Sequence, residues 1–289
     1  MRPWSKIKEK LGARSGARKS NAGGMIEIGA KTDVGRVREG NEDSFRVVPE
    51  IRLMIVSDGM GGAACGEVAS VLAVETIARE CAEPVASDSA ATEVTSAIPA
   101  ASRRAELSGR TNRLLVAVQS ANRLIYEAAK NDPAKRGMGA TVVAAWLDGL
   151  RLSVVHVGDS RAYLFRAGAL KRLTLDHTLV AEQVRAGILT RQQADTSALQ
   201  SVLIRALGPD AVVELDAEEH QLRAGDAVLL CSDGLSRMVR DAEIGGVLAK
   251  ASSAQAAADG LVKLANKHGG EDNVTAIVMR IPAGYHVGR

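Results

Sequence analysis

The segment IRLMIVSDGMGG, residues 51–62, sets a carboxylate at the end of an unbroken apolar run and follows it with glycines. Short apolar runs bounded by turn residues predict buried β-strands, and this one would end at Asp58. An Asp-Gly pair alone usually marks a turn, because Asp hydrogen-bonds to its own backbone and Gly tolerates positive φ. One such pair therefore says little about function.

The same arrangement occurs at three further places in the chain. LSVVHVGDS contains Asp159, AVLLCSDGLS contains Asp233, and GGEDNVTAIVM places Asp272 just before an apolar run. If these strand ends meet, like charges share a small volume and repel one another unless a cation neutralises them. Oxygen ligands favour a hard cation, Mg²⁺ or Mn²⁺, and the small residues after Asp58 would let the carbonyl of Gly59 reach the same ion.

Around these segments, the hydrophobic pattern predicts groups of successive strands separated by helices. The expected strands are 25–30, 44–48, 51–57, 140–147, 151–158, 161–166, 169–174, 213–220, 226–232 and 273–281, and the expected helices are 65–81, 112–131, 241–249 and 253–267. The strands between 140 and 174 are separated by short turns, GDS among them, which indicates successive antiparallel hairpins. We therefore predict an α+β layered fold with one core.

Four segments stand apart from that core. Residues 1–24 are basic and end in a Gly-rich run, 83–110 lack a sustained period, 178–206 form a polar helical stretch, and 284–289 are a short tail. We expect a single domain at 25–283 and a solvated leader before it. The alternative for the leader is a short helix that touches an anionic membrane or a partner.

Composition narrows the functional classes. The formal charge of the 289 residues is +3, much of it in the leader, and aromatics are only 2%, so a nucleic-acid surface is not expected. The three cysteines show no metal or disulfide spacing, and no run resembles a secretory signal or a membrane span. We expect a cytoplasmic protein, and we expect it to be a monomer.

Six motifs in order resemble the metal-dependent Ser/Thr protein phosphatases of the type 2C family, in their bacterial form: VREGNED, VSDGMGG, VGDSRAYL, LTLDHTLV, CSDGLSRMV and EDNVTAIV. The resemblance covers residues 25–281. It implies a four-layer α-β-β-α sandwich, in which two antiparallel sheets are flanked by pairs of helices. It also implies that 178–206 is the mobile flap of that family.

The resemblance implies metal ligands. Asp58 corresponds to the carboxylate that bridges two catalytic ions of Mg²⁺ or Mn²⁺, with the Gly59 carbonyl on one of them. Asp233 and Asp272 correspond to further ligands of the second ion. Asp159 corresponds to the carboxylate that, together with Asp233, holds a third and weaker ion.

It also implies residues that act on substrate and water. Arg38 corresponds to the arginine that binds phosphate, and Asp43 to the carboxylate that positions a metal-bound water. We expect Glu42 and Asn273 to support these groups. Met60 stands where eukaryotic members carry a histidine, which leaves the general acid unassigned.

His177 is expected to hydrogen-bond locally at a strand end, and His156 to pack within its strand.

The implied activity is hydrolysis of phosphoserine and phosphothreonine by an activated water, without a covalent phospho-enzyme. Phosphorylated proteins and a bacterial Ser/Thr kinase would then be the partners. Two alternatives stay open: a non-catalytic sensing module with the same fold, and a phosphatase dedicated to one regulatory phosphoprotein.

Overall fold

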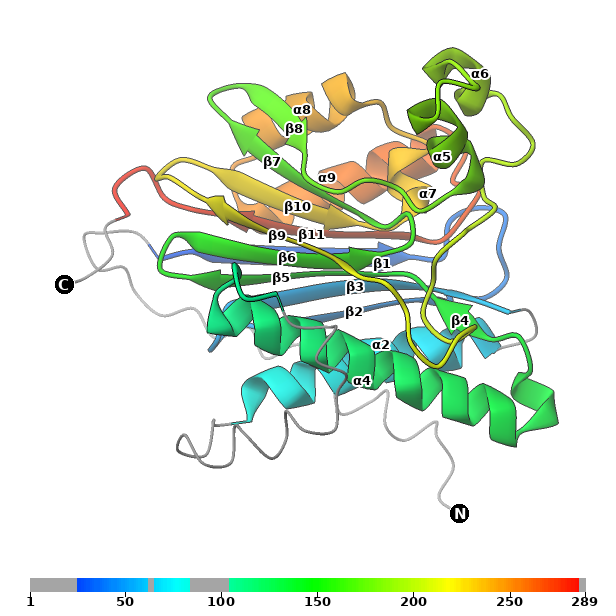
Figure 1. Ribbon diagram of the computed structural model, residues 1–289. Coiled ribbons are helices and arrows are strands. Elements are labelled where there is room, and N and C mark those ends of the chain that lie inside the picture. Colours follow the sequence, from blue (N-terminus) through cyan, green and yellow to red (C-terminus); the bar gives the residue numbers. More distant parts are fainter. Residues whose placement is uncertain (1–24, 62–64, 84–103, 286–289) are drawn as a thin grey trace.

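The computed structural model describes residues 25–61, 65–83 and 104–285. Two β-sheets lie face to face, with helices covering the outer face of each, so that four layers are visible in Figure 1. The expected α-β-β-α sandwich is confirmed.

The two sheets divide the strands in an order that the chain does not follow. The first has the order β1-β11-β10-β7-β8, with bounds Glu27–Asp33, Val274–Arg280, Ala227–Cys231, Arg161–Arg166 and Ala169–Arg172. The second has the order β2-β3-β5-β6-β9, with bounds Asp43–Val48, Leu53–Met60, Val142–Asp148, Arg151–Val157 and Asp216–Gln221. The short β4, Gly139–Ala140, pairs with the end of β3. Every pairing is antiparallel.

A pair of helices packs on each sheet. Helices α2 (Cys65–Ala82) and α4 (Gly109–Asn131) cover the second sheet, and α8 (Asp241–Lys250) and α9 (Ala254–Lys267) cover the first (Figure 1). Shorter elements are η3 (Pro133–Lys135), α5 (Leu179–Arg185), α6 (Arg191–Asp195) and α7 (Asp233–Ser236).

Burial on both faces explains why β3 begins with the unbroken apolar run Leu53–Val56. Leu53 and Ile55 pack under the helices α2 and α4, whereas Met54 and Val56 pack against the other sheet. Successive side chains of a strand point to opposite faces, so a strand in the middle of a four-layer fold needs apolar residues at every position. The run ends where the chain reaches the edge of the core.

Four predicted elements differ from the structure. The GDS turn does not close a hairpin, because β6 and β7 belong to different sheets. Strand 140–147 is interrupted between β4 and β5, and 213–220 is shortened to β9. The helical stretch 178–206 contains only α5 and α6, separated by Gly187 at φ 71°. That backbone conformation suits glycine and ends a helix.

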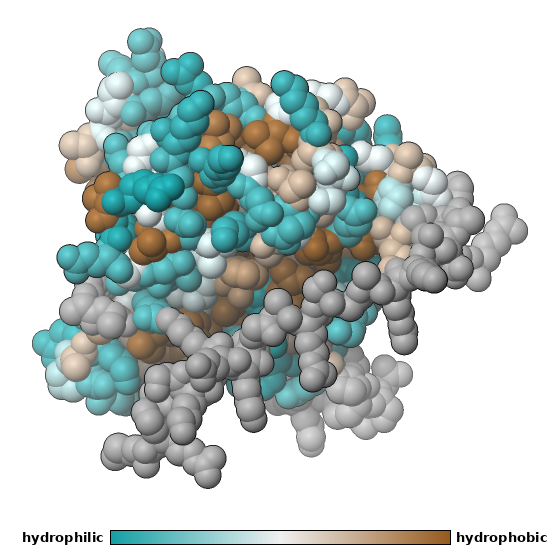
Figure 2. Space-filling model, turned by 180° about the vertical axis from the view of Figure 1, so that it is seen from behind, coloured by the Kyte–Doolittle hydropathy of each residue, from teal (hydrophilic) through white to brown (hydrophobic). Residues whose placement is uncertain are grey.

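Several predictions fall wholly or partly outside the described residues: the leader 1–24, most of the 83–110 segment and most of the tail. Of that segment, 104–110 are described, and α4 begins at Gly109 after an N-cap in which Ser108 accepts from the Thr111 backbone N–H. None of the described helices is both long and apolar enough to cross a bilayer. From behind, the described surface is largely hydrophilic, with apolar residues scattered among the polar ones (Figure 2).

Candidate metal centre

The structure brings the predicted aspartates together from both sheets. Asp43 begins β2 and lies directly opposite Asp58 in the β2–β3 register. Asp159 follows β6, Asp233 follows β10, and Asp272 precedes β11. Their charges act on one another: the electrostatic neighbours of Asp58 are the other four carboxylates.

The crossover between the sheets explains how Asp159 reaches this cluster. Since β6 and β7 lie in different sheets, residues 158–160 pass from one to the other at the sheet edge. Gly158 has φ 99° there, and Ser160 hydrogen-bonds through its hydroxyl to Thr141 at 2.7 Å. The Thr141 hydroxyl in turn accepts from the Asp58 backbone N–H at 3.2 Å. This connection fixes the Asp58 and Asp159 segments relative to each other.

Glycines let backbones approach closely around the carboxylates. A Cβ on Gly59 would lie 2.0 Å from the Gly66 carbonyl oxygen at the start of α2, and a Cβ on Gly234 would lie 2.1 Å from the Asn273 carbonyl oxygen. No side chain can be accommodated at such distances. The glycines beside Asp58 and Asp233 are therefore required by packing, in addition to any space they leave for a ligand.

Burial makes these carboxyl groups difficult to ionise. It is the largest cause that raises the pKa of Asp43 to about 7 and the pKa of Asp159 to about 7, and neighbouring carboxylates add to it. Burial and the same repulsion raise the pKa of Asp58 well above its ordinary value. Burial also raises the pKa of Asp233, although the Arg237 guanidinium counteracts it. A cation among them would reverse these shifts, because it stabilises the charged form.

Two carboxylate oxygens in the cluster are buried without a hydrogen-bond partner, Asp43 Oδ1 and Asp233 Oδ1. Buried polar atoms in native proteins normally have partners, so each needs an explanation. A divalent ion or a water bound to it would satisfy both atoms. With oxygen donors only, the cluster suits Mg²⁺ or Mn²⁺.

The other oxygen of Asp43 is held firmly. The hydroxyls of Ser232 and Thr275 both donate to Asp43 Oδ2, each at 2.7 Å. The Thr275 hydroxyl also hydrogen-bonds to that of Thr32, at 2.8 Å, and Asn41 donates to Thr32 at 2.9 Å. This chain of donors fixes the orientation of the carboxylate and leaves Oδ1 free.

Arg38 lies at the rim of the cluster. Its Nη2 is 2.9 Å from Asp272 Oδ2, and its side chain is 54% exposed. Asn273 fastens the loop that carries Arg38, because its side-chain amide donates to the carbonyls of Val34 and Gly40 and accepts from the Glu42 backbone N–H. The Glu42 carbonyl then accepts from the Gly59 backbone N–H at 3.2 Å.

Three side chains that contact these carboxylates were not predicted from the sequence: Ser232, Thr275 and Arg237. Arg237 Nη2 lies 2.7 Å from Asp233 Oδ2 and 3.2 Å from Asp159 Oδ2. The signal for it was present, since Arg237 is four residues after Asp233 and that spacing places two side chains on one face of a helical turn.

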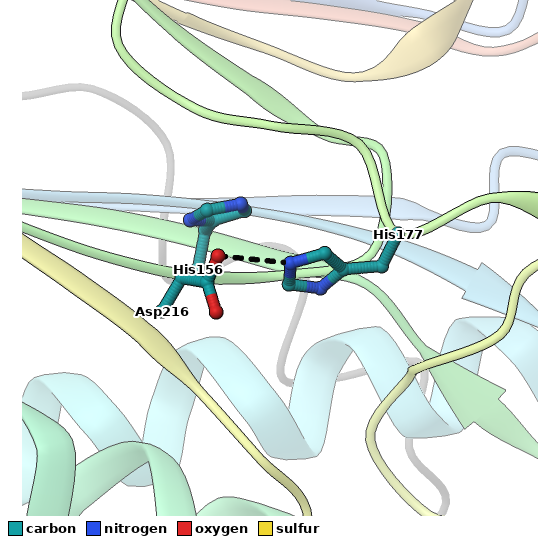
Figure 3. A group of neighbouring side chains, drawn as sticks. All are labelled: His156, His177 and Asp216. Carbon is teal, nitrogen blue, oxygen red and sulfur yellow. Dashed lines mark hydrogen bonds and ion pairs between the residues drawn. The ribbon is translucent and has the colours of Figure 1, made fainter. Parts of the chain in front are cut away.

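A second group of possible ligands, His156, His177 and Asp216, serves a structural purpose (Figure 3). The Gly158 backbone N–H donates to His177 Nδ1 at 3.2 Å, and His177 Nε2 lies 3.3 Å from Asp216 Oδ2. Both ring nitrogens are thus engaged, and no lone pair of His177 is left for a metal. His156 stacks on His177 and bonds through Nε2 to the Leu175 carbonyl, while burial lowers the pKa of His156 to about 4. The pair secures the crossover that carries Asp159.

An open surface depression of about 450 Å³ lies between α8 and α9, and none of the clustered aspartates lines it. It does not extend the site.

Comparison with known proteins identifies relatives of the whole fold. The family model described as Protein phosphatase 2C matches residues 36–270. The serine/threonine phosphatase stp of Listeria innocua is 34% identical over 252 residues, which are 86% of this chain and 93% of that protein. The serine/threonine protein phosphatase PstP of Mycobacterium tuberculosis is 37% identical over 254 residues, 88% of this chain but 45% of that protein.

Solved structures agree with these relatives. The M. tuberculosis phosphatase PstP/Ppp superposes with a TM-score of 0.75 at 36% identity, covering 89% of this chain and 99% of that one. The catalytic domain of PstP in complex with two manganese ions gives a TM-score of 0.70 at 36% identity, covering 89% and 98%.

Proposed function

The chain belongs to the protein phosphatase 2C family and is a metal-dependent protein phosphatase that uses Mg²⁺ or Mn²⁺, and from this premise we propose that it hydrolyses phosphoserine and phosphothreonine in proteins. The observation that supports this most directly is the convergence of five carboxylates, two of which keep a buried oxygen without a hydrogen-bond partner. The relatives named above are serine/threonine phosphatases.

For the two catalytic ions, we assign the ligands that the sequence motifs predict. Asp58 would bridge two ions, the Gly59 carbonyl would bind one, and Asp233 and Asp272 would bind the other. When bound, two such ions activate a water for attack on phosphorus and neutralise phosphoryl oxygens. Asp233 Oδ1 is buried without a hydrogen-bond partner, which supports the assignment of Asp233 as a metal ligand.

Residues of the chain would orient and exchange protons with the reacting groups. Asp43 has Oδ2 fixed by two hydroxyls and Oδ1 free, so it can hold a water in one orientation and accept its proton. Arg38 is mostly exposed and bonds Asp272 through a single nitrogen, Nη2. Its other N–H groups can bind two phosphate oxygens in a forked geometry.

We also propose limits and context for the domain. The phosphatase domain would extend over 25–283, with a flap at 178–206 whose base is fastened by the Thr178–Leu203 bridge. Phosphorylated proteins and a Ser/Thr kinase would be its partners in bacterial signalling. The sequence contains few cysteines, and their spacing is not that of a disulfide framework, which fits a reducing cytoplasm.

Phosphate release from synthetic phosphopeptides tests this function. With Mn²⁺, the full chain should act on phosphoserine and phosphothreonine peptides and lose activity in chelator. Asp58→Asn should lower kcat/KM by roughly a thousandfold or more, since it removes the carboxylate assigned to both ions. Asp259→Asn, an exposed aspartate on α9, is the matched control and should remain fully active.

Equal activity of Asp58→Asn and wild type would refute the assignment of ligands. A folded wild-type protein that binds Mn²⁺ but releases no phosphate would instead support the non-catalytic sensing module. Turnover of one phosphoprotein alone, with none of the peptides, would support the dedicated enzyme.

A further inference from the structure

Arg237 lies between Asp159 and Asp233, the two carboxylates that the sequence motifs assign to a third cation. Its Nη2 contacts one oxygen of each of two carboxylates, Asp233 Oδ2 at 2.7 Å and Asp159 Oδ2 at 3.2 Å. A metal shared by those two carboxylates would bind oxygens at about 2.0–2.6 Å, and therefore needs the space between them. The guanidinium already fills that space.

The backbone holds Arg237 in this position. Asp233 and Arg237 are the first residue and the C-cap of the single helical turn α7, and the Arg237 backbone N–H donates to the Asp233 carbonyl at 2.8 Å. Gly234, between them, packs against the backbone of Asn273 with no room for a side chain. The helical turn thus directs the arginine back over Asp233, as i and i+4 side chains share one face.

Arg237 also offsets part of the cost of ionising Asp159. Asp159 is 6% exposed, so burial opposes its charge, and the guanidinium beside it counteracts that effect in part. The guanidinium joins Asp159, at the crossover from β6, to Asp233, at the end of β10, and so connects the two sheets. Burial lowers the pKa of the Arg237 guanidinium, but the charges of Asp233 and Asp159 outweigh this effect and raise it. Arg237 is therefore a permanent cation.

Asp233 remains able to serve the catalytic ions while it is bound to Arg237. The contact uses Oδ2, and Oδ1 is the oxygen without a hydrogen-bond partner. One carboxylate can therefore bind the guanidinium through one oxygen and a divalent ion through the other. Asp159 contacts the guanidinium as well, so a third ion bound to Asp159 would have to displace this ion pair.

We propose that the guanidinium of Arg237 replaces a third divalent cation between Asp159 and Asp233, so that this chain binds two ions and no third. The inference rests on the proposed function, because it concerns the same metal centre. Its consequence is that an exchangeable double charge is replaced by a fixed single one, and occupancy there no longer depends on metal concentration. Arg237 acts as a positioning residue that orients Asp233.

Counting bound Mn²⁺ tests the proposal without reference to turnover. Equilibrium dialysis, or the electron paramagnetic resonance signal of free Mn²⁺, gives the number of ions per full chain up to millimolar metal. We expect two ions for wild type, a third and weaker ion for Arg237→Ala, and two again for the double variant Arg237→Ala/Asp159→Asn. Arg237→Lys keeps a cation and should bind two.

The outcomes separate this inference from the function it rests on. Three ions on wild type, or two on Arg237→Ala, would overturn the replacement and leave the phosphatase intact. No bound Mn²⁺ on wild type would overturn both. If Arg237→Ala does not fold, the wild-type count and Arg237→Lys still decide, since a third ion on either contradicts the proposal.

Discussion

The substitution Asp159→Asn should make the metal-free protein more stable, and increasingly so as the pH rises. Asp159 is almost completely buried, and burial raises its pKa from 3.8 to about 7. Asparagine has nearly the same shape and keeps an oxygen that can accept from Arg237, but it has no charge to bury.

The direction follows from proton binding. Because the folded state binds this proton more tightly than the unfolded state, protonated Asp159 contributes stability at low pH that is lost as the pH rises from about 4 to about 7. A rise of about three pH units in pKa, at about 1.4 kcal/mol each, makes ionisation cost the folded protein about 4 kcal/mol above pH 7. About 1 kcal/mol of this is already present at pH 4.5.

The difference in free energy of unfolding between Asp159→Asn and wild type should therefore increase by about 3 kcal/mol between pH 4.5 and pH 8. The weaker bond from Arg237 to asparagine adds a difference that is the same at both pH values and does not change this increase. In a chain of this size that corresponds to a shift of roughly 6–12 °C in the difference between their melting temperatures.

Thermal or urea unfolding in chelator, at both pH values, measures this difference. Asp259→Asn controls for the loss of a charge at an exposed site and should show no such dependence on pH. If the gap between Asp159→Asn and wild type is the same at both pH values, or narrows toward pH 8, Asp159 is not a carboxylate whose ionisation burial opposes.

Three further changes have definite outcomes. Arg38→Ala should raise KM for a phosphopeptide by about tenfold or more, because a charged hydrogen bond to phosphate is lost. The Mn²⁺ affinity measured by calorimetry should be unchanged, and weaker Mn²⁺ binding would contradict the assignment of Arg38 to phosphate. Gly59→Ala should prevent folding or greatly reduce soluble yield, because its Cβ would meet a carbonyl at 2.0 Å, whereas Gly40→Ala meets nothing within 4 Å and should behave as wild type in a melting experiment. His177→Gln should lower the free energy of unfolding by about 1–3 kcal/mol, because buried hydrogen bonds are lost. Zn²⁺ should not stabilise wild type through this site, and a zinc-dependent rise in melting temperature that His177→Gln abolishes would refute the structural role of His177.

The hydrophobic pattern was sufficient for most elements and for the layered class of fold. β3 and β11 contain the apolar runs Leu53–Val56 and Ala276–Met279 because both faces of these strands are buried, and that burial is visible in the sequence. The pattern could not show that the GDS turn leaves one sheet for the other. Alternation along a strand reports which faces are buried, but it says nothing about which strand lies alongside.

The candidate site divides in the same way. Acidic residues at the ends of apolar runs indicated that carboxylates would meet, and their oxygen atoms indicated the kind of ion, because both conclusions depend on residue type and local position alone. The hydroxyls of Ser232 and Thr275 on Asp43 depended on packing between distant segments.

The polar stretch 178–206 shows a further limit. Its composition favoured a helix, yet only two short helices form, since backbone bonds across its base, such as the Ile204 N–H to the His177 carbonyl, compete with helical ones. Tertiary contacts outweigh the small differences in helix propensity between residues.

By itself, the sequence determined that four acidic strand ends exist and that they suit a hard cation, because charge and periodicity are local properties. Only the tertiary structure decided that Asp159 and Asp233 share the guanidinium of Arg237. The physical reason is that an ion pair depends on distances of a few ångströms between side chains, and these are set where the two sheets meet rather than by position in the chain.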